Sequence, residues 1–180
     1  MKNIPFIISL FLLLMMSTQS LFAQNLSMSN YQLGSGDSIQ INVFGEDDLS
    51  LSTMLGDTGI INYPFLGEIK VTGLTVNQVI ELITKGLKGD YLINPSVRVS
   101  ITEYRQFFIN GEVENPGGYA YQPGLNVNKA IALAGGMTER ASNNGITIIR
   151  ASDTKQAEIK AMLKDLIYPG DIIKVEESFF

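Results

Sequence analysis

The sequence predicts an α+β fold made of two small units, and three observations support this prediction. Apolar and polar residues alternate with a period of two over 38–43 and again over 97–102, as in strands with one buried face. One segment, 75–87, repeats apolar residues at helical spacing. Near residue 104 a new series of turn and hairpin signals begins, which indicates a second unit.

The first unit opens with a glycine-rich turn. Gly34 and Gly36 permit a turn that a side chain would block, and Asp37 can cap that turn with its own carboxylate. A phosphate-binding role for this Gly-Ser-Gly loop would require a helix to begin directly after it. A strand is predicted there instead, which favours a structural role. The further strands expected in this unit lie at 60–61, within 64–71 and at 97–102.

The clearest helix of the sequence follows Thr75. Thr75 and Gln78 have the spacing of a capping box, in which each side chain satisfies a backbone donor at the helix start. Leu74 and Val79 occupy the positions of a hydrophobic staple across that cap. The predicted buried stripe of this helix consists of Val76, Val79, Ile80, Ile83 and Leu87.

The second unit is predicted to be a small sheet around one helix. A hairpin is expected over 107–121, with its tight turn at 114–118. Asn126 is expected to cap a helix that Gly135 and Gly136 end, because glycine adopts left-handed geometry at low cost. The remaining expected elements are a strand over 146–150, a short helix over 159–166 and a closing strand over 172–175.

Composition excludes several classes of function. The chain has 180 residues, 45% of them hydrophobic, so it can form a core. Its net charge of −5 and its lack of a dense Lys/Arg cluster argue against nucleic acid as a partner. Cysteine and histidine are absent, which excludes a thiol nucleophile, a disulfide, a Cys/His zinc site and a lipid-modified cysteine. We therefore expect a protein that is not a lipoprotein.

The acidic residues do not suggest an enzyme. Glu46, Asp47 and Asp48 form a loop of solvated composition, without the glycine and ligand spacing of an EF-hand. Glu112 and Glu114 flank one strand residue, and both are expected on the surface of a hairpin. Neither group makes a convincing dyad for glycoside hydrolysis. We predict no catalytic, metal-binding or cofactor-binding residues.

The N-terminus has the pattern of a secretory signal peptide. Lys2 precedes an apolar run over 4–16, and a more polar stretch leads to Ala23. Cleavage is predicted after Ala23, although Leu21 departs from the small-residue rule and leaves cleavage after Ser20 open. The alternative is a retained anchor, for which the apolar run is short, since a spanning helix needs about 20 residues.

Ordered motifs along the chain resemble those of the outer-membrane and periplasmic polysaccharide export proteins. The first unit resembles the small α/β polysaccharide export domain, and the second resembles a soluble-ligand-binding β-grasp (SLBB) domain. The resemblance implies a signal peptide over 1–23, an export domain over 24–103 and one SLBB domain over 104–180. The motif residues, with structural or interface roles, are Tyr31, Gly34, Gly36, Asp37, Pro64, Gly67, Gly73, Asn94, Pro95, Gly111, Val113, Pro116, Gly117, Gly135, Gly136, Pro169, Gly170 and Asp171.

This resemblance implies a periplasmic ring, commonly an octamer, that conducts a capsular polysaccharide or exopolysaccharide toward the outer membrane. The implied partners are the translocated polysaccharide, further copies of this chain and an inner-membrane co-polymerase. Long members of the family carry a lipid-modified cysteine, repeated β-grasp domains and a pore-lining amphipathic helix, which this sequence lacks. We therefore expect a separate outer-membrane pore protein as a further partner. Phe179 and Phe180 either contact that partner or the membrane, or pack on the protein's own core.

A second interpretation remains open from the sequence. The protein could be a periplasmic β-grasp module that binds a glycan or another ligand and forms no conduit, because fold alone does not decide function. Its aromatic residues could then stack on sugar rings. The candidates for stacking are Tyr63, Phe65, Tyr119 and Tyr121.

Overall fold

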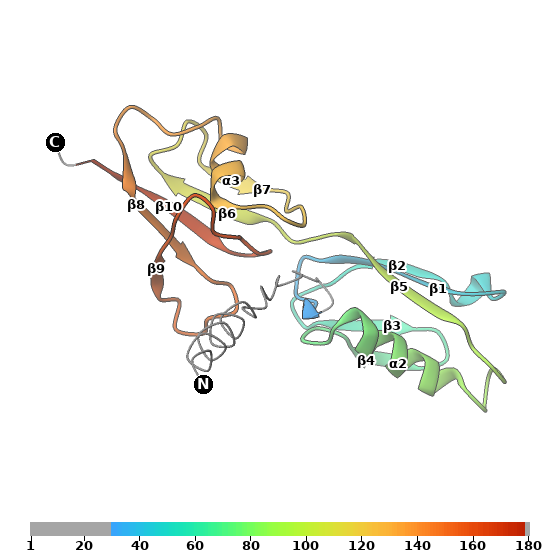
Figure 1. Ribbon diagram of the computed structural model, residues 1–180. Coiled ribbons are helices and arrows are strands. Elements are labelled where there is room, and N and C mark those ends of the chain that lie inside the picture. Colours follow the sequence, from blue (N-terminus) through green and yellow to red (C-terminus); the bar gives the residue numbers. More distant parts are fainter. Residues whose placement is uncertain (1–29, 179–180) are drawn as a thin grey trace, which may run out of the picture.

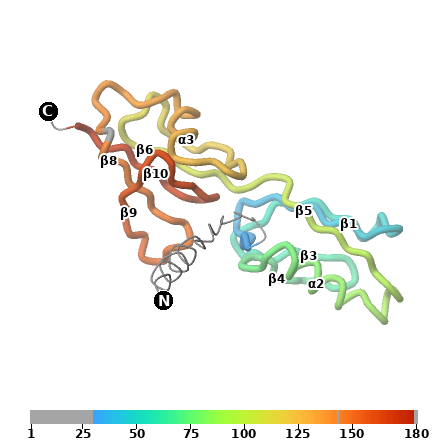
Figure 2. The backbone as a smooth tube through the Cα atoms, viewed as in Figure 1, coloured from blue at the N-terminus to red at the C-terminus, as the bar shows by residue number. Residues whose placement is uncertain are grey.

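The computed structural model describes residues 30–178, which form two units arranged end to end (Figure 1). The predicted signal peptide and the pair Phe179–Phe180 lie outside the described residues. Within 30–178, none of the helices has the length and apolar character needed to cross a membrane. The smooth backbone trace shows one extended crossing of the chain from the first unit into the second (Figure 2).

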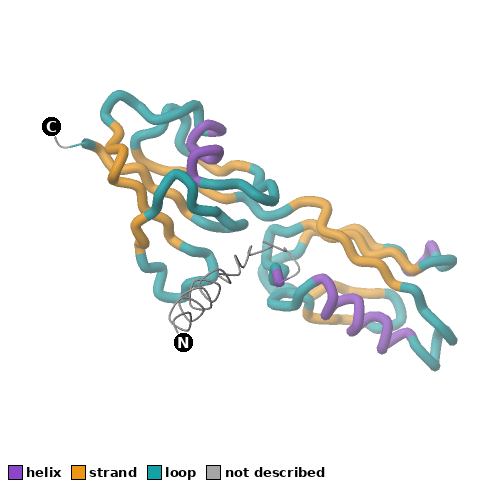
Figure 3. Tube along the Cα trace, in the orientation of Figure 1, coloured by secondary structure: helices purple, strands orange, loops and turns teal. Residues whose placement is uncertain are grey.

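The first unit combines a three-stranded sheet, a separate hairpin and one long helix. Its elements are β1 (Ser38–Val43), the 3-10 turn η2 (Asp47–Leu49), β2 (Leu51–Met54), β3 (Ile60–Tyr63), β4 (Gly67–Lys70), α2 (Val76–Leu87) and β5 (Val97–Glu103). The sheet order is β2-β1-β5, and β1 is antiparallel to both neighbours. Strands β3 and β4 form the hairpin, which lies with α2 on one side of the sheet (Figure 3).

The periodicity of the sequence is confirmed in this unit. Ile39, Ile41 and Val43 of β1 are buried, and the residues between them are less buried or exposed. On α2 the most deeply buried positions are Val79, Ile83 and Leu87, while Val76 and Ile80 are only partly buried at the edge of the same cluster. Strand β2 was not among the predicted elements. Its residues alternate only between partly buried and exposed, and its sequence, Leu-Ser-Thr-Met, does not alternate between apolar and polar residues.

Helix α2 begins with the predicted capping box. The Thr75 hydroxyl accepts a hydrogen bond from the backbone N–H of Gln78 at 3.3 Å, and the Gln78 side-chain oxygen accepts one from the Thr75 N–H at 2.8 Å. We expect Thr75→Ala to lower the free energy of unfolding by about 1 kcal/mol, because it removes one cap acceptor. Thr84→Ala, inside the same helix, makes the same chemical change without a cap and should leave stability unchanged or slightly higher. Urea denaturation followed by circular dichroism would measure both, and equal losses would contradict the capping role.

The second unit is a five-stranded sheet with one helix. Its elements are β6 (Phe107–Gly111), β7 (Gly117–Tyr119), α3 (Val127–Leu133), β8 (Ala141–Ile149), β9 (Glu158–Lys160) and β10 (Ile172–Glu177). The sheet order is β7-β6-β10-β8-β9, in which β6 and β10 are parallel and the other neighbours are antiparallel. The predicted cap of α3 is present, because the Asn126 side chain accepts from the Lys129 N–H at 2.9 Å.

One predicted element of this unit is wrong. Residues 159–166 were expected to form a short helix, but Glu158–Lys160 is the edge strand β9, paired with β8. A turn follows, in which the Asp165 carboxylate accepts from the Met162 N–H at 2.7 Å. The helical spacing of apolar residues here arises from an edge strand followed by a turn. Pairing with β8 outweighs the local pattern, because it satisfies backbone N–H and C=O groups of the strand. The partner strand that satisfies them is not specified by the neighbouring residues in the sequence.

Each unit has its own hydrophobic cluster. The cluster of the first unit contains residues of β1, β3, α2 and β5. Its Tyr63 is 1% exposed and donates a hydrogen bond to the Leu49 carbonyl at 2.7 Å. In the second, residues of β6, β8, β10 and α3 surround Phe107, which is fully buried. Two helices, many strands and two cores over residues 30–178 confirm the α+β fold class.

Candidate functional site

The glycine turn before β1 is organised by Asp37. This carboxylate is fully buried and accepts hydrogen bonds from the backbone N–H of Gly34 at 2.8 Å and from the Tyr31 hydroxyl at 2.6 Å. The predicted capping of the turn by Asp37 is therefore confirmed. Because a carboxylate already occupies the Gly34 donor, this contact favours a structural role for the loop.

Arg105 joins this turn to the segment that connects the two units. Strand β5 lies antiparallel to β1, so the residue just beyond its end reaches the Asp37 turn. The backbone N–H of Arg105 donates to Asp37 Oδ1 at 2.8 Å, and Nη1 donates to Asp37 Oδ2 at 3.2 Å and to the Tyr31 hydroxyl at 2.9 Å. The guanidinium carbon stands 5.5 Å from the centre of the Tyr31 ring. The first turn of the described chain is thus tied to residues 68 positions away in the sequence.

The second unit repeats the same arrangement around Asp171. This carboxylate is buried and accepts from Arg150 Nη1 at 2.6 Å, from the Ala151 N–H at 3.1 Å and from the Tyr168 N–H at 2.9 Å. Arg150 follows β8 as Arg105 follows β5, and its guanidinium lies 5.3 Å from the centre of the Tyr168 ring. In each unit a buried aspartate therefore stands directly before one strand. An arginine just past the end of the antiparallel neighbouring strand forms an ion pair with it.

The two aspartate turns meet where the units join. A Cβ atom placed on Gly170 would lie 3.0 Å from Nε of Arg105, so the backbone of the second turn passes directly beside this guanidinium. The Gly170 N–H also donates to the Gln106 carbonyl at 3.0 Å. A row of edge-to-face aromatic contacts crosses the junction, from Tyr31 to Tyr104 at 5.2 Å and from Tyr104 to Tyr121 at 5.4 Å between ring centres.

A cavity of about 520 Å³ opens between the two turns. Its volume lies within the usual range for small-ligand pockets. Residues from both units line it, which makes the junction the candidate functional site of the described chain. The lining includes Tyr31, Leu33 and Gly73 from the first unit, Arg105 from the connection, and Ser152 and Tyr168 from the second.

The structure brings some motif residues together and separates others. Those at or beside the junction are Tyr31, Gly34, Gly36, Asp37, Gly73, Pro169, Gly170 and Asp171. The others serve turns elsewhere: Pro64 and Gly67 between β3 and β4, Asn94 and Pro95 before β5, Gly111 and Val113 at the end of β6, Pro116 and Gly117 before and in β7, and Gly135 and Gly136 after α3. Sequence reasoning missed Arg105 and Arg150. The signal that would find them is an arginine just beyond a strand whose antiparallel partner begins directly after Gly-Asp. Recognising this signal requires knowing which strands pair.

The other candidates of the sequence are dispersed. Glu46, Asp47 and Asp48 are exposed around η2, as expected. Glu112 and Glu114 follow β6 instead of flanking a strand residue, and Glu112 accepts a hydrogen bond from the Thr138 hydroxyl at 2.6 Å. Within residues 30–178 no three acidic side chains gather as metal ligands.

Two of the four aromatics considered for sugar stacking are core residues. Tyr63 is 1% exposed and Tyr121 is 6% exposed, so neither ring is available to a ligand. Tyr119 packs against Phe107, with 6.0 Å between ring centres. Phe65 is exposed, but its ring is stacked on Tyr91 at 4.8 Å.

The junction predicts a loss of stability at alkaline pH. Burial, together with the hydrogen bond to Asp37, raises the pKa of Tyr31 well above its ordinary value near 10. An unfolded Tyr31 loses its proton near pH 10, whereas the folded state retains it. The associated stability is therefore complete below about pH 10 and decreases as the pH rises beyond it. We expect urea midpoints to fall above that pH, and Tyr31→Phe to reduce the slope; an unchanged slope would contradict this role for Tyr31.

Comparison with known proteins identifies both units. Residues 25–102 match the family model for polysaccharide biosynthesis/export protein, and residues 106–160 match the model for the SLBB domain. The chain belongs to the polysaccharide export family. The order of the two matched domains along the chain agrees with the order of the two units described above, and the resemblance stated from the motifs is confirmed.

Curated relatives carry names from polysaccharide production and export. The chain is 38% identical over 95 residues to the exopolysaccharide production protein ExoF of Rhizobium meliloti, covering 51% of this chain and 22% of that protein. It is 27% identical over 181 residues to the EPS I polysaccharide export outer membrane protein EpsA of Ralstonia nicotianae, covering 82% of this chain and 47% of EpsA. It is 29% identical over 126 residues to the polysialic acid transport protein KpsD of Escherichia coli, covering 68% of this chain and 23% of KpsD. The chain thus spans less than half the length of these relatives.

Proposed function

We propose that this protein is a periplasmic ring subunit of a bacterial polysaccharide export machine. Copies of the chain would surround a polar conduit through which a capsular polysaccharide or exopolysaccharide moves toward the outer membrane. The observation that carries the proposal is the succession of an export domain and an SLBB domain over 25–160, in a chain whose relatives are named for export. We also propose that the role is non-enzymatic, because the exposed acidic side chains are dispersed and the two buried ones, Asp37 and Asp171, are each paired with an arginine.

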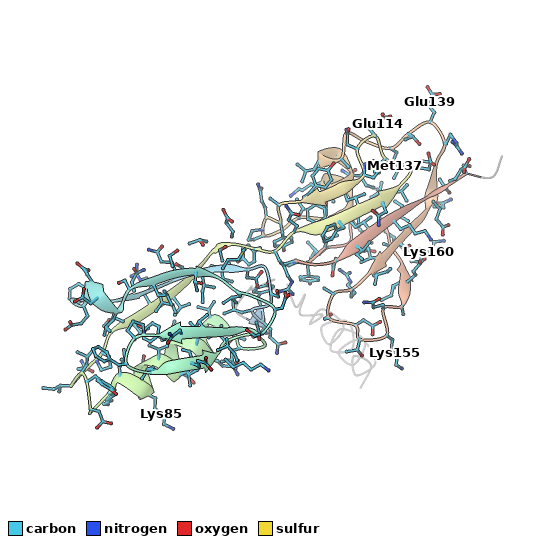
Figure 4. All side chains as sticks on the ribbon, turned by 180° about the vertical axis from the view of Figure 1, so that it is seen from behind. Lys85, Glu114, Met137, Glu139, Lys155 and Lys160 are labelled. Atoms are coloured by element: carbon cyan, nitrogen blue, oxygen red, sulfur yellow. The ribbon has the colours of Figure 1, made fainter. Side chains whose placement is uncertain are left out.

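Two features of the surface support assembly into a ring. Both units expose large apolar side chains; Phe44 is 89% exposed, Ile93 94% and Met162 63%, which suits burial between subunits. A closed ring also requires two unlike surfaces that meet head to tail. In the second unit, Glu114 and Glu139 project at the end away from the first unit, while Lys155 and Lys160 lie along a different side, near β9 (Figure 4).

The proposed partners follow from this location. The ring would be an octamer that lies between an inner-membrane co-polymerase and a separate outer-membrane pore protein. Residues 24–103 would form the export domain and 104–180 the SLBB domain, after removal of a signal peptide over 1–23. The net negative charge is concentrated in the first of these segments, which holds nine Asp or Glu and four Lys or Arg, whereas the second holds nine Asp or Glu and eight Lys or Arg. Such a wall would repel an acidic glycan and so limit its adhesion to weak, local contacts.

The proposal predicts a closed assembly in solution. The protein would be purified after export to the periplasm, and its mass measured by light scattering and native mass spectrometry over a range of concentrations, with and without mild detergent. We expect one discrete multiple of the subunit mass that persists on dilution. A monomer under all conditions would contradict the ring and favour the alternative, a glycan-binding module that forms no conduit.

A genetic experiment tests the export role separately. In a strain that lacks this protein, the surface glycan should be lost and should accumulate inside the cell envelope. Restoring the full-length gene should restore the surface glycan, whereas a copy without residues 1–23 should not. Normal surface glycan in the deletion strain would contradict the export role.

A further inference from the structure

Arg105 lines the cavity between the two units. The Arg105 side chain is 26% exposed, whereas the Asp37 carboxylate with which it pairs is fully buried. Nη1 is engaged with Asp37 and Tyr31. Nε and Nη2 have no hydrogen-bond partner within residues 30–178, and no buried side-chain nitrogen of that part lacks a partner, so each of the two retains contact with solvent. Arg105 therefore offers two further donors to whatever enters the cavity.

The cavity provides few acceptors that compete for these donors. Asp171 is the acidic residue in its lining, but this side chain is 2% exposed and its two oxygens already accept three hydrogen bonds. The guanidinium is planar and carries donors in a fork that fits a carboxylate through two parallel hydrogen bonds. The site therefore favours a ligand with a carboxylate over a ligand with hydroxyl groups alone.

The remaining lining fits the body of a sugar. The rings of Tyr31, which is half-buried, and Tyr168, which is 39% exposed, provide apolar surface, with the buried side chains of Leu33 and Pro169 behind them. Ser152, which is exposed at the second unit's side of the cavity, can exchange hydrogen bonds with ring hydroxyls. A pyranose ring has both kinds of surface, with apolar C–H faces and a polar edge.

We propose that this cavity binds an acidic sugar unit, with the sugar carboxylate held by Nε and Nη2 of Arg105. The proposal rests on the proposed function, since it identifies one contact of the exported glycan with its carrier. Binding would be weak and rapidly reversible, because a subsite along a conduit must release its passenger. An uronic-acid unit is the chemical class that fits the donors and the apolar lining.

The test follows the Arg105 Nε–H resonance in ¹⁵N NMR spectra of the isotopically labelled protein. The probes are a hyaluronan tetrasaccharide, which alternates glucuronic acid with N-acetylglucosamine, the neutral N-acetylglucosamine tetramer, and sodium sulfate. We expect the acidic tetrasaccharide to shift this resonance with a dissociation constant in the millimolar range, and the neutral one to bind at least about tenfold more weakly. No shift, an equal shift with the neutral sugar, or an equal shift with sulfate would each overturn the proposal.

Variants separate binding from folding. Arg105→Lys keeps the charge beside Asp37 but loses the fork, and because it also lacks the Nε–H, its binding is followed through the backbone amide resonance of Ser152. Ser152→Trp places a bulky ring in the cavity from an exposed position whose native side chain makes no hydrogen bond to the Arg105–Asp37 pair. Both should weaken binding of the acidic tetrasaccharide at least about tenfold while the remaining spectrum stays native. Ser50→Trp, at an exposed position outside the cavity lining, is the matched control and should bind like the parent protein. Undiminished binding by Ser152→Trp would overturn the site.

Failure of this inference is distinguishable from failure of the proposed function. If deletion of the gene abolishes surface glycan but the Arg105 resonance does not respond, the subsite is wrong and the export role stands. If the resonance responds but deletion leaves surface glycan unchanged, the sugar site stands and the export role is wrong.

Discussion

Replacing Asp37 by alanine is expected to lower the free energy of unfolding by about 3 kcal/mol, because the change leaves the Arg105 guanidinium without its buried partner. The carboxylate is fully buried and accepts from Tyr31, from Gly34 and from both the backbone and the side chain of Arg105. Removal of one member of a buried ion pair costs about 3–5 kcal/mol. The lower end applies here, since the Arg105 side chain is 26% exposed and water can solvate part of its charge.

The measurement is urea denaturation, followed by circular dichroism. Glu46→Gln is the matched control, because it removes an exposed carboxylate of the same unit whose side chain makes no cap hydrogen bond, and it should change stability by less than about 0.5 kcal/mol. Asp37→Asn keeps one acceptor oxygen and should fall between the control and Asp37→Ala. A loss for Asp37→Ala no larger than that of the control would show that the turn does not depend on this carboxylate.

Gly111→Ala is expected to cost about 3 kcal/mol, through both backbone strain and a direct collision. Gly111 has a φ of +87°, which an L side chain rarely adopts. A Cβ at this position would also fall on the carbonyl oxygen of Val175, well inside van der Waals contact. Because Val175 belongs to the central strand β10, and its carbonyl accepts from the Glu112 N–H at 2.9 Å, relief of the collision must separate β6 from β10.

Gly117→Ala provides the comparison within the same motif. A Cβ on Gly117 would meet no heavy atom within 4 Å, and its φ lies outside the left-handed region. We therefore expect a change of less than about 0.5 kcal/mol for Gly117→Ala. Thermal and urea unfolding of both variants would test the difference, and amide hydrogen exchange would show whether the loss in Gly111→Ala is concentrated in β6 and β10. Similar losses in the two variants would mean that the collision at Gly111 relaxes easily.

The candidate site illustrates where sequence reasoning stops. Local chemistry predicted the Asp37 turn, because a carboxylate three residues after a backbone N–H can close its own turn. The motif also contained Gly170 and Asp171. Their partners Arg105 and Arg150 were not predicted, since each arginine reaches its aspartate through the pairing of two strands that are far apart in the sequence. The cavity between the turns depends on the packing of the two units and has no local signal.

The sequence by itself determined the α+β class, the strand alternation of β1, the capped helices α2 and α3 and the order of the two units, because these depend on spacing and capping over a few residues. Only the tertiary structure decided that residues 158–160 form an edge strand instead of the predicted helix, because pairing with β8 satisfies backbone groups that no local pattern specifies. It also decided that two buried aspartates, one in each unit, face a common junction. Their meeting requires β5 to end beside the first turn and the backbone of the second turn to pass Arg105, which are long-range contacts that a one-dimensional pattern does not encode.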